Sequence, residues 1–131
     1  MALPVTAIIA GLLALWMIFL QTRVIGFRRG TRVSLGHADD VMGERLIRAH
    51  GNAAENIPIF LILLGLSEGL GTPSWVLWLL GLTFIAGRVL HGIHFFKVRQ
   101  GGMMRVLGMM LTFFPLGATA LGVIGHGLDS L

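Results

Sequence analysis

An uninterrupted apolar run near the start of the chain restricts what it can fold into. Residues Leu3 to Leu20 include no charged side chain, and a run of about 18 or more apolar residues predicts a transmembrane helix. A cleavable signal peptide is the alternative, but it would carry basic residues before the apolar run, whereas here the arginines follow it. We therefore expect an uncleaved first span over about residues 3–20.

The chain as a whole is too apolar for a soluble domain. Of its 131 residues, 55% are hydrophobic and 12% are charged, whereas soluble domains carry about 25% charged residues. A chain of this length cannot hide so much apolar surface in a core of its own, so the bilayer is its expected solvent. The length suits a single domain, residues 1–131. Cysteine is absent, which excludes disulfides and thiolate chemistry by the chain itself.

Three further segments complete the expected fold, which is an all-α, integral membrane four-helix bundle. They cover about residues 40–70, 75–96 and 103–125. Gly26, Gly30 and Gly36 are expected to end any helix that continues from the first span, leaving a loop from Gln21 to Asp40. The second segment would be about 45 Å long, which exceeds the ~30 Å hydrocarbon layer. Its polar first half must then project from the membrane or lie inside the bundle.

The basic residues give the expected orientation. Lys and Arg gather in the first and third loops, and both termini and the middle loop lack them. Under the positive-inside rule the two basic loops are cytoplasmic and both termini lie outside. Arg28, Arg29 and Arg32 are expected to mark this topology and to contact membrane lipid headgroups. Nucleic-acid binding is disfavoured, because the basic residues lie between apolar spans and not along one soluble face.

Polar side chains gather on one face of each of the last three segments. Residues three and four apart share a helix face. The faces so defined are Glu44, Arg48, Asn52 and Glu55 in the second segment, Phe84, Arg88, His91 and Phe95 in the third, and Arg105, Gly108, Met109 and Thr112 in the fourth. All three lie toward the cytoplasmic ends of their helices, so we expect them at a similar depth. Ionisable groups inside membrane spans are costly and indicate a functional site by default.

Such a cluster would form a net cationic pocket suited to an anionic polar molecule that also carries an ammonium group. Arginines bind carboxylates through paired hydrogen bonds, and Glu55 would bind the ammonium. A guanidinium would also lower the pKa of a ligand thiol and so favour a thiolate nucleophile. Ion pairs such as Glu44–Arg48 or Glu55–Arg88 that only join the helices are the structural alternative. No metal site is expected, because the two closely spaced histidines of the third segment lack a third ligand.

Two of these segments also carry a family signature. The second segment contains Glu44-Arg45, Arg48-Ala49-His50, Asn52, Glu55, Pro58 and Phe60. This run resembles the second-helix signature of the MAPEG family, the membrane-associated proteins in eicosanoid and glutathione metabolism. The third-helix motif of that family resembles Gly87-Arg88-Val89-Leu90-His91. Chain length, span pattern and orientation agree as well. The likeness therefore extends over nearly the whole chain, and it is greatest to bacterial branches of the family.

The resemblance implies a homotrimer of four-helix subunits in a bacterial inner membrane. Glutathione would be the cofactor, bound near the cytoplasmic side between neighbouring subunits. The positions that match the family's glutathione-contacting places are Arg23, Asn52, Glu55, His91 and Arg105. Arg105 is expected to be the catalytic residue, as the thiolate stabiliser. Arg48 and Arg88, from the faces described above, are assigned to the same cofactor-binding set.

The chain also departs from the family pattern at three places. Members with well-defined catalysis often carry an arginine just before the Asn52 position, where this chain has Gly51. They often carry tyrosines where this chain has Phe95 and Met109, and this chain contains no tyrosine at all. No phenol hydroxyl can therefore position the thiol. These departures favour weaker glutathione binding or a different small ligand.

The expected function is a glutathione-dependent membrane transferase or peroxidase that acts on lipophilic electrophiles entering from the bilayer. One alternative is a non-catalytic membrane protein that uses the same polar cluster for assembly or for binding a lipid or anion. Another is a small transporter or proton pathway, suggested by the intramembrane His and Glu residues. The last is disfavoured because the charges gather at one end and four spans leave little room for alternating access.

Overall fold

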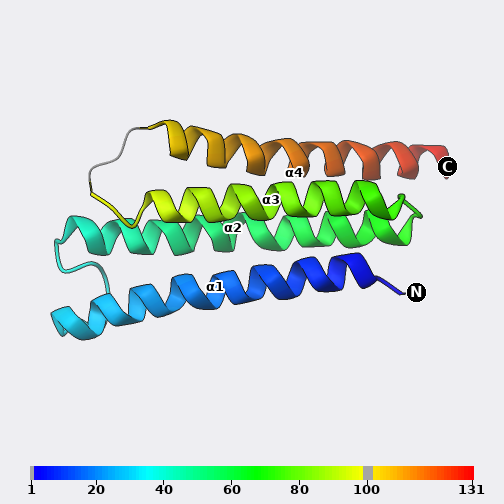
Figure 1. Ribbon diagram of the computed structural model, residues 1–131. Helices are drawn as coiled ribbons and strands as arrows, with labels where there is room; N and C mark the ends of the chain where they lie inside the picture. The colour runs from blue at the N-terminus through cyan, green and yellow to red at the C-terminus, as the bar shows by residue number, and fades with distance from the viewer. Residues whose placement is uncertain (1, 99–101) are drawn as a thin grey trace.

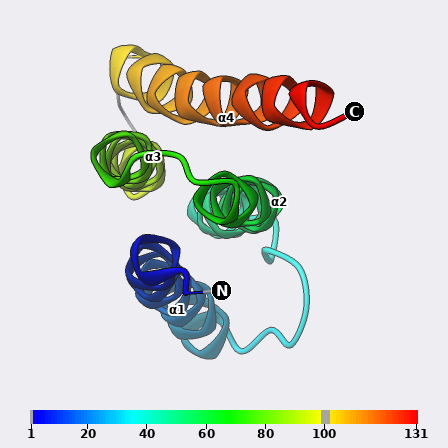
Figure 2. The same cartoon turned by 90° about the vertical axis from the view of Figure 1, so that its right-hand side faces the viewer.

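A computed structural model describes residues 2–98 and 102–131, and these form a bundle of four helices. The helices are α1 (Pro4–Thr31), α2 (Val41–Gly69), α3 (Ser74–His94) and α4 (Met103–Asp129). They run alternately up and down, so both termini lie at the same end of the molecule (Figure 1). Viewed from the end, α2 and α3 lie between α1 on one side and α4 on the other (Figure 2). The predicted all-α bundle is confirmed.

Three of the helices have the composition of membrane spans. By length and hydropathy, α1, α3 and α4 are each able to cross a bilayer. The remaining helix, α2, is also long, with 29 residues, or about 43 Å at 1.5 Å per residue. Its first half carries the polar face of Glu44, Arg48, Asn52 and Glu55, and its apolar half begins only near Pro58. α2 packs along α1, α3 and α4, and Glu44, Arg48 and Glu55 in its polar half remain exposed.

The first helix is longer than predicted. The expectation that Gly26 and Gly30 would end it was wrong, because α1 continues through both glycines to Thr31. A glycine inside a helix costs only about 1 kcal/mol relative to alanine, which the flanking helical residues tolerate. The helix ends instead at Arg32, whose backbone is left-handed with φ of 58°. The arginines before that cap lie at the negative end of the helix dipole, which is a favourable position.

Two carboxylates fix the ends of α2. Asp40 is its N-cap, and the side chain accepts hydrogen bonds from the backbone N–H groups of Met42 (2.7 Å) and Gly43 (3.0 Å). At the other end Glu68 accepts hydrogen bonds from the N–H groups of Val5 (2.9 Å) and Thr6 (2.7 Å). These two N–H groups lie in the first turn of α1 and have no partner within that helix. Glu68 therefore ties the end of α2 to the start of α1.

An apolar core fills the middle of the bundle. Its most buried members include Ile9, Leu13, Phe60, Leu64, Leu77 and Phe84. The rings of Phe60 and Phe84 stack with centroids 3.9 Å apart and an interplanar angle of 4°. Apolar contact across α1, α2 and α3 therefore continues up to the level of the polar face on α2.

Two glycines let α3 and α4 approach closely. A Cβ atom built on Gly87 would lie 2.7 Å from the backbone carbonyl carbon of Leu111, and one built on Gly108 would lie 2.8 Å from the backbone nitrogen of His91. Contacts this short are not available to real Cβ atoms, so only glycine fits at either place. The crossing brings the polar residues of α3 directly against α4.

Candidate functional site

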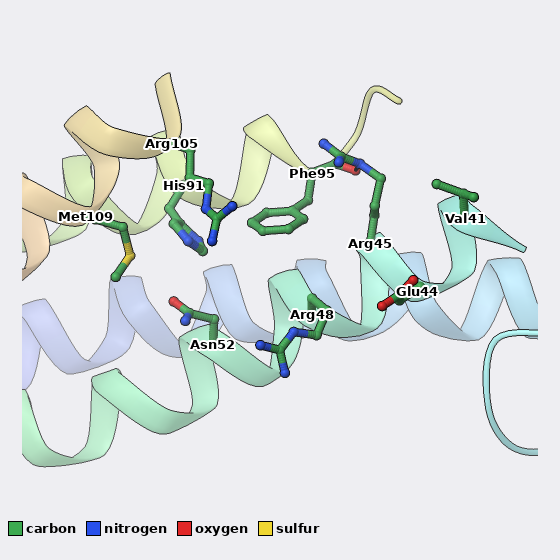
Figure 3. Close-up of a pocket in the computed structure, with 9 residues that line it drawn as sticks. All are labelled: Val41, Glu44, Arg45, Arg48, Asn52, His91, Phe95, Arg105 and Met109. Atoms are coloured by element: carbon green, nitrogen blue, oxygen red, sulfur yellow. Dashed lines mark hydrogen bonds between the residues drawn. The ribbon is translucent and has the colours of Figure 1, made fainter. Parts of the chain in front are cut away.

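A pocket of about 340 Å³ lies near the end of the bundle where α2 and α4 begin and α3 ends. It is lined by Val41, Glu44, Arg45, Arg48, Asn52, His91, Phe95, Arg105 and Met109 (Figure 3). Its volume falls in the range of about 300–1,000 Å³ that is usual for small-molecule sites. All three predicted polar faces contribute to it, so the expectation that they share one depth holds within the chain.

The lining is mainly cationic. Three guanidiniums, one carboxylate and one imidazole surround the cavity. Arg105 and His91 extend from α4 and α3 toward Asn52 and Arg48 on the opposite side (Figure 3). Arg105 and Arg48 are exposed, whereas His91 is buried. The pocket can therefore receive an anionic group at an open mouth and place it against less solvated groups inside.

Arg88 lies behind the pocket and holds Asn52 in place. It is almost fully buried, with a relative exposure of 1%. Its Nη1 donates to Asn52 Oδ1 at 2.6 Å, and its Nε donates to Thr112 Oγ1 at 2.8 Å. Because a guanidinium only donates, the Asn52 oxygen must face Arg88. The Nδ2 group of Asn52 then remains as a donor for other acceptors at the pocket.

The acceptors of Arg88 are neutral. Besides Asn52 and Thr112 it meets the thioether sulfur of Met109 at 3.8 Å, and its guanidinium carbon lies 6.0 Å from the ring centroid of Phe84. The alternative ion pair between Glu55 and Arg88 is not formed within the described residues of the chain. A buried charge whose partners are an amide and a hydroxyl leaves the inner wall of the pocket net positive.

Arg45 was not predicted as a site residue, and it closes one wall of the pocket. Its Nη2 donates to the carbonyl of His94 at 2.8 Å, and its Nε donates to the carbonyl of Phe95 at 3.3 Å. The guanidinium also lies 5.2 Å from the ring centroid of Phe95. These carbonyls end α3 and need donors from outside the helix. The unpaired carbonyls at the end of a helix are predictable from the sequence. Which side chain donates to them is not.

The fold of the chain brings only some of the predicted site residues together. Arg48, Asn52, His91 and Arg105 line the pocket, and Arg88 supports it from behind. Glu55 is exposed on α2 and does not line it. Arg23 is exposed on α1 and lines a separate hollow with Thr22, Gly26, Phe27 and Leu46. There its guanidinium lies 5.2 Å from the ring centroid of Phe96. The assignment of Arg23 and Glu55 to a glutathione site stays a prediction.

No metal-binding group was expected, and the described ranges 2–98 and 102–131 contain no cluster of three or more His, Cys, Asp or Glu side chains able to hold a metal ion. The polar groups that line the pocket are guanidiniums, an imidazole, an amide and a carboxylate.

A four-helix bundle with three apolar spans and a cationic pocket at one end defines an integral membrane protein of the helical-bundle class. The model of the MAPEG family matches residues 6–125, and the chain belongs to this family. Inner membrane protein YecN of Escherichia coli strain K12 is 35% identical over 103 residues, which cover 76% of this chain and 79% of that protein. YecN of Escherichia coli O6:H1 gives the same values.

These comparisons confirm the family resemblance found in the sequence. Together with the apolar helices, they identify an integral inner membrane protein. Which side of the membrane the termini face stays a prediction from the distribution of Lys and Arg.

Proposed function

We propose that the protein is a glutathione-dependent membrane transferase or peroxidase-like enzyme. The observation that carries the proposal is the cavity of about 340 Å³ bordered by Arg45, Arg48 and Arg105, with Glu44 beside them. Membership of a family of eicosanoid and glutathione metabolism supports the same reading. The proposed occupant is glutathione, and the second substrate is a lipophilic electrophile.

The groups of glutathione find counterparts in the pocket. Glutathione carries two carboxylates, one ammonium, one thiol and two amide bonds. Guanidiniums bind carboxylates in pairs of charge-assisted hydrogen bonds. Glu44 is the carboxylate that lines the pocket in one subunit, so it can bind the ammonium there. Asn52, with its oxygen held by Arg88, supplies an amide N–H donor. In a homotrimer, which we propose as the assembly, Glu55 and Arg23 would approach from neighbouring subunits.

In the proposed reaction Arg105 stabilises the glutathione thiolate. A nearby guanidinium favours the ionised thiol, which is the nucleophile. In conjugation the sulfur forms a bond to an electrophilic carbon while the leaving group departs with its bonding pair. In peroxide reduction the sulfur bonds to one peroxide oxygen while the O–O bond breaks, which releases the alcohol and leaves glutathione sulfenic acid. A second glutathione thiol then displaces water from this sulfur and gives the disulfide. Phe95 and Met109 line the pocket without a hydroxyl, so the guanidinium acts without a phenol.

Titration of the detergent-solubilised protein with glutathione tests the proposal. Saturation should raise the unfolding temperature, because ligand at a hundred times Kd contributes about 2.7 kcal/mol to the native state. Thiolate absorbance should appear with wild type and be reduced in Arg105→Gln. S-methylglutathione is the control, because it should stabilise the protein without any thiolate signal. Absence of both stabilisation and thiolate absorbance would refute the assignment.

A non-catalytic role in assembly or in binding a lipid or anion is the second candidate. The observation that favours it is that Phe95 and Met109 provide no hydroxyl at the pocket. Under this alternative, Arg105→Ala would alter assembly or the retention of a bound lipid or anion. Neither wild type nor Arg105→Ala would convert a generic electrophile such as 1-chloro-2,4-dinitrobenzene. Glutathione conjugation by wild type that is lost in Arg105→Ala would exclude it.

A further inference from the structure

The buried guanidinium of Arg88 has three nitrogens, and their acceptors differ in strength. Nη1 donates to Asn52 Oδ1 at 2.6 Å, and Nε donates to Thr112 Oγ1 at 2.8 Å. Within residues 2–98 and 102–131, Nη2 meets only the sulfur of Met109, at 3.8 Å. A thioether is a weak acceptor, whereas the N–H groups of a guanidinium are strong donors. One side of a buried cation is therefore left with the poorest of its acceptors.

The side chain of Met109 is also accessible from the pocket. Met109 is half-buried and lines the cavity together with Asn52 and His91. It extends from α4 toward Asn52 (Figure 3), so it borders both the cavity and Arg88. A small reagent in the cavity can therefore reach the thioether, and a polar atom added to the sulfur would meet a donor.

Oxidation is the modification to which a thioether in this position is suited. It converts methionine to the sulfoxide, in which an apolar group becomes a polar one. The 3.8 Å between Nη2 and the sulfur exceeds the usual N···O hydrogen-bond length of about 2.7–3.2 Å. A sulfoxide oxygen bent toward Nη2 would therefore reach hydrogen-bond distance without a large movement of either side chain. A guanidinium bonds more strongly to such an oxygen than to a thioether.

We propose that Met109 is a site of oxidation by hydroperoxides, and that Arg88 holds the resulting sulfoxide. A lone pair of the sulfur forms a bond to the outer oxygen of the hydroperoxide, ROOH, while the O–O bond breaks. The proton of that oxygen passes to the departing oxygen, which leaves as the alcohol, ROH. The sulfur is oxidised from thioether to sulfoxide, and the hydroperoxide is reduced. Nη2 of Arg88 stabilises the product by donating to the new oxygen.

Two other methionines of α4 lack such a donor. Met103 and Met110 are more exposed, at 79% and 63%, and within the described residues no guanidinium contacts the sulfur of either. Exposure alone predicts that both are oxidised before Met109. Stabilisation by Arg88 predicts instead that Met109 is oxidised at least as fast as Met103, so the order of oxidation distinguishes the two.

The sulfoxide would also change the glutathione pocket, and this consequence rests on the proposed function. Its oxygen is negatively polarised and would lie against Arg88, so it would offset part of the positive charge behind Asn52. The carboxylates of glutathione would then be attracted less strongly to the inner wall. Oxidation of Met109 should therefore lower the affinity for glutathione, and reduction of the sulfoxide should restore it.

Treatment of the detergent-solubilised protein with tert-butyl hydroperoxide, followed by fragment-ion mass spectrometry, measures the oxidation of each methionine. In wild type, Met109 should gain one oxygen at least as fast as Met103. In Arg88→Leu, oxidation of Met109 should be severalfold slower, with Met103 unchanged. The proposal would be overturned if Met109 stayed a thioether after Met103 was fully oxidised, or if Met109 reacted equally fast in both proteins.

A second comparison leaves Arg88 in place, because its removal can itself unfold the protein. Glutamine offers a carbonyl oxygen in place of the sulfoxide oxygen, and leucine is the apolar control. Met109→Gln should unfold at or above the temperature of Met109→Leu. At the exposed neighbour, Met110→Gln should unfold below Met110→Leu. A glutamine variant that is the less stable one at both positions would contradict the proposed contact with Arg88.

Glutathione titration separates the modification from the proposed function. Met109→Gln should bind glutathione severalfold more weakly than Met109→Leu, and Met110→Gln should bind it as wild type does. Equal affinities of the two Met109 variants would overturn the effect on the pocket. If wild type did not bind glutathione, the proposed function would fail, while the oxidation rates and unfolding temperatures would still decide whether Arg88 holds an oxidised Met109.

Discussion

Arg88 carries a full charge in a place from which water is almost entirely removed. Burying a charge is costly unless hydrogen bonds compensate it. Here the compensation comes from Asn52 and Thr112, which hold two of the three guanidinium nitrogens. Removing one acceptor should therefore be worse than removing the acceptor and the charge together.

Asn52→Leu should lower the stability of the protein by about 1–3 kcal/mol or more, because it leaves a buried charged donor without its main acceptor. The double variant Asn52→Leu/Arg88→Met should recover much of that loss, since both members are replaced by apolar groups. Thermal unfolding in detergent measures both effects. If the losses of stability in Asn52→Leu and Arg88→Met simply added up in the double variant, the two residues would not be coupled.

Helical spacing predicted the residues on the polar faces but not their roles. The spacings of three and four correctly put Arg48, Asn52, His91 and Arg105 together. They did not show that Arg88 lies behind the pocket, because spacing gives a face and not a depth. They also missed Arg45, since its partners are backbone carbonyls of α3 that carry no signal in the sequence of α2.

At the scale of the helices, the geometry of the pocket depends on how closely α3 approaches α4. Gly87 and Gly108 face the opposite backbone at the level of His91. The side chains of α3 and α4 are therefore positioned by direct contact between the two backbones. A single methyl group at this crossing must push the helices apart.

Gly87→Ala should destabilise the protein by about 1–3 kcal/mol, the usual cost of overpacking, and should weaken glutathione binding by moving His91 away from Arg105. Gly117→Ala is the matched control, because a Cβ there meets nothing within 4 Å. Unfolding temperature and glutathione titration give the two readouts. Equal behaviour of the two variants would contradict the role of the crossing.

The contact between α2 and α1 gives a second test at this scale. Glu68→Gln removes the charge that accepts from two N–H groups at the start of α1. A carboxylate at a helix N-terminus is worth about 0.5–2 kcal/mol, so the variant should unfold at a lower temperature. Glutathione affinity should not change, because Glu68 lies at the opposite end of α2 from the pocket. A large loss of affinity would argue against this local role.

Glycine content did not reveal which glycines end a helix. Gly26 and Gly30 continue α1, whereas Gly87 and Gly108 are required by a tertiary contact. The difference lies in what each glycine meets in three dimensions, and one sequence does not contain that information. The number of helices was predictable because apolar runs and loops alternate so regularly.

At the scale of the whole molecule, the pocket lies at the end where α2 and α4 begin. Both termini lie at the other end (Figure 1). The positive-inside rule assigns the arginine-rich end to the cytoplasm. Glutathione would then reach the pocket from the compartment in which it is abundant.

The absence of cysteine makes this orientation testable with single substitutions. Ser34→Cys and Ser130→Cys introduce thiols at exposed positions at opposite ends of the bundle. In intact cells a membrane-impermeant maleimide should label Ser130→Cys, and it should label Ser34→Cys only after the inner membrane is permeabilised. The reverse pattern would place the pocket on the outer side.

The stack of Phe60 on Phe84 beneath Arg88 also decides where the electric field of that cation can act. Hydrocarbon and aromatic rings polarise little, so they form a wall of low dielectric constant below and around the charge. Walls of this kind focus field lines toward the solvent-filled side of a cleft. The attraction of Arg88 for an anion is therefore directed through Asn52 to the mouth of the pocket, and it is screened less by salt than that of the exposed arginines. A residue that does not line the cavity thus adds a directed field to that of the three arginines at the pocket.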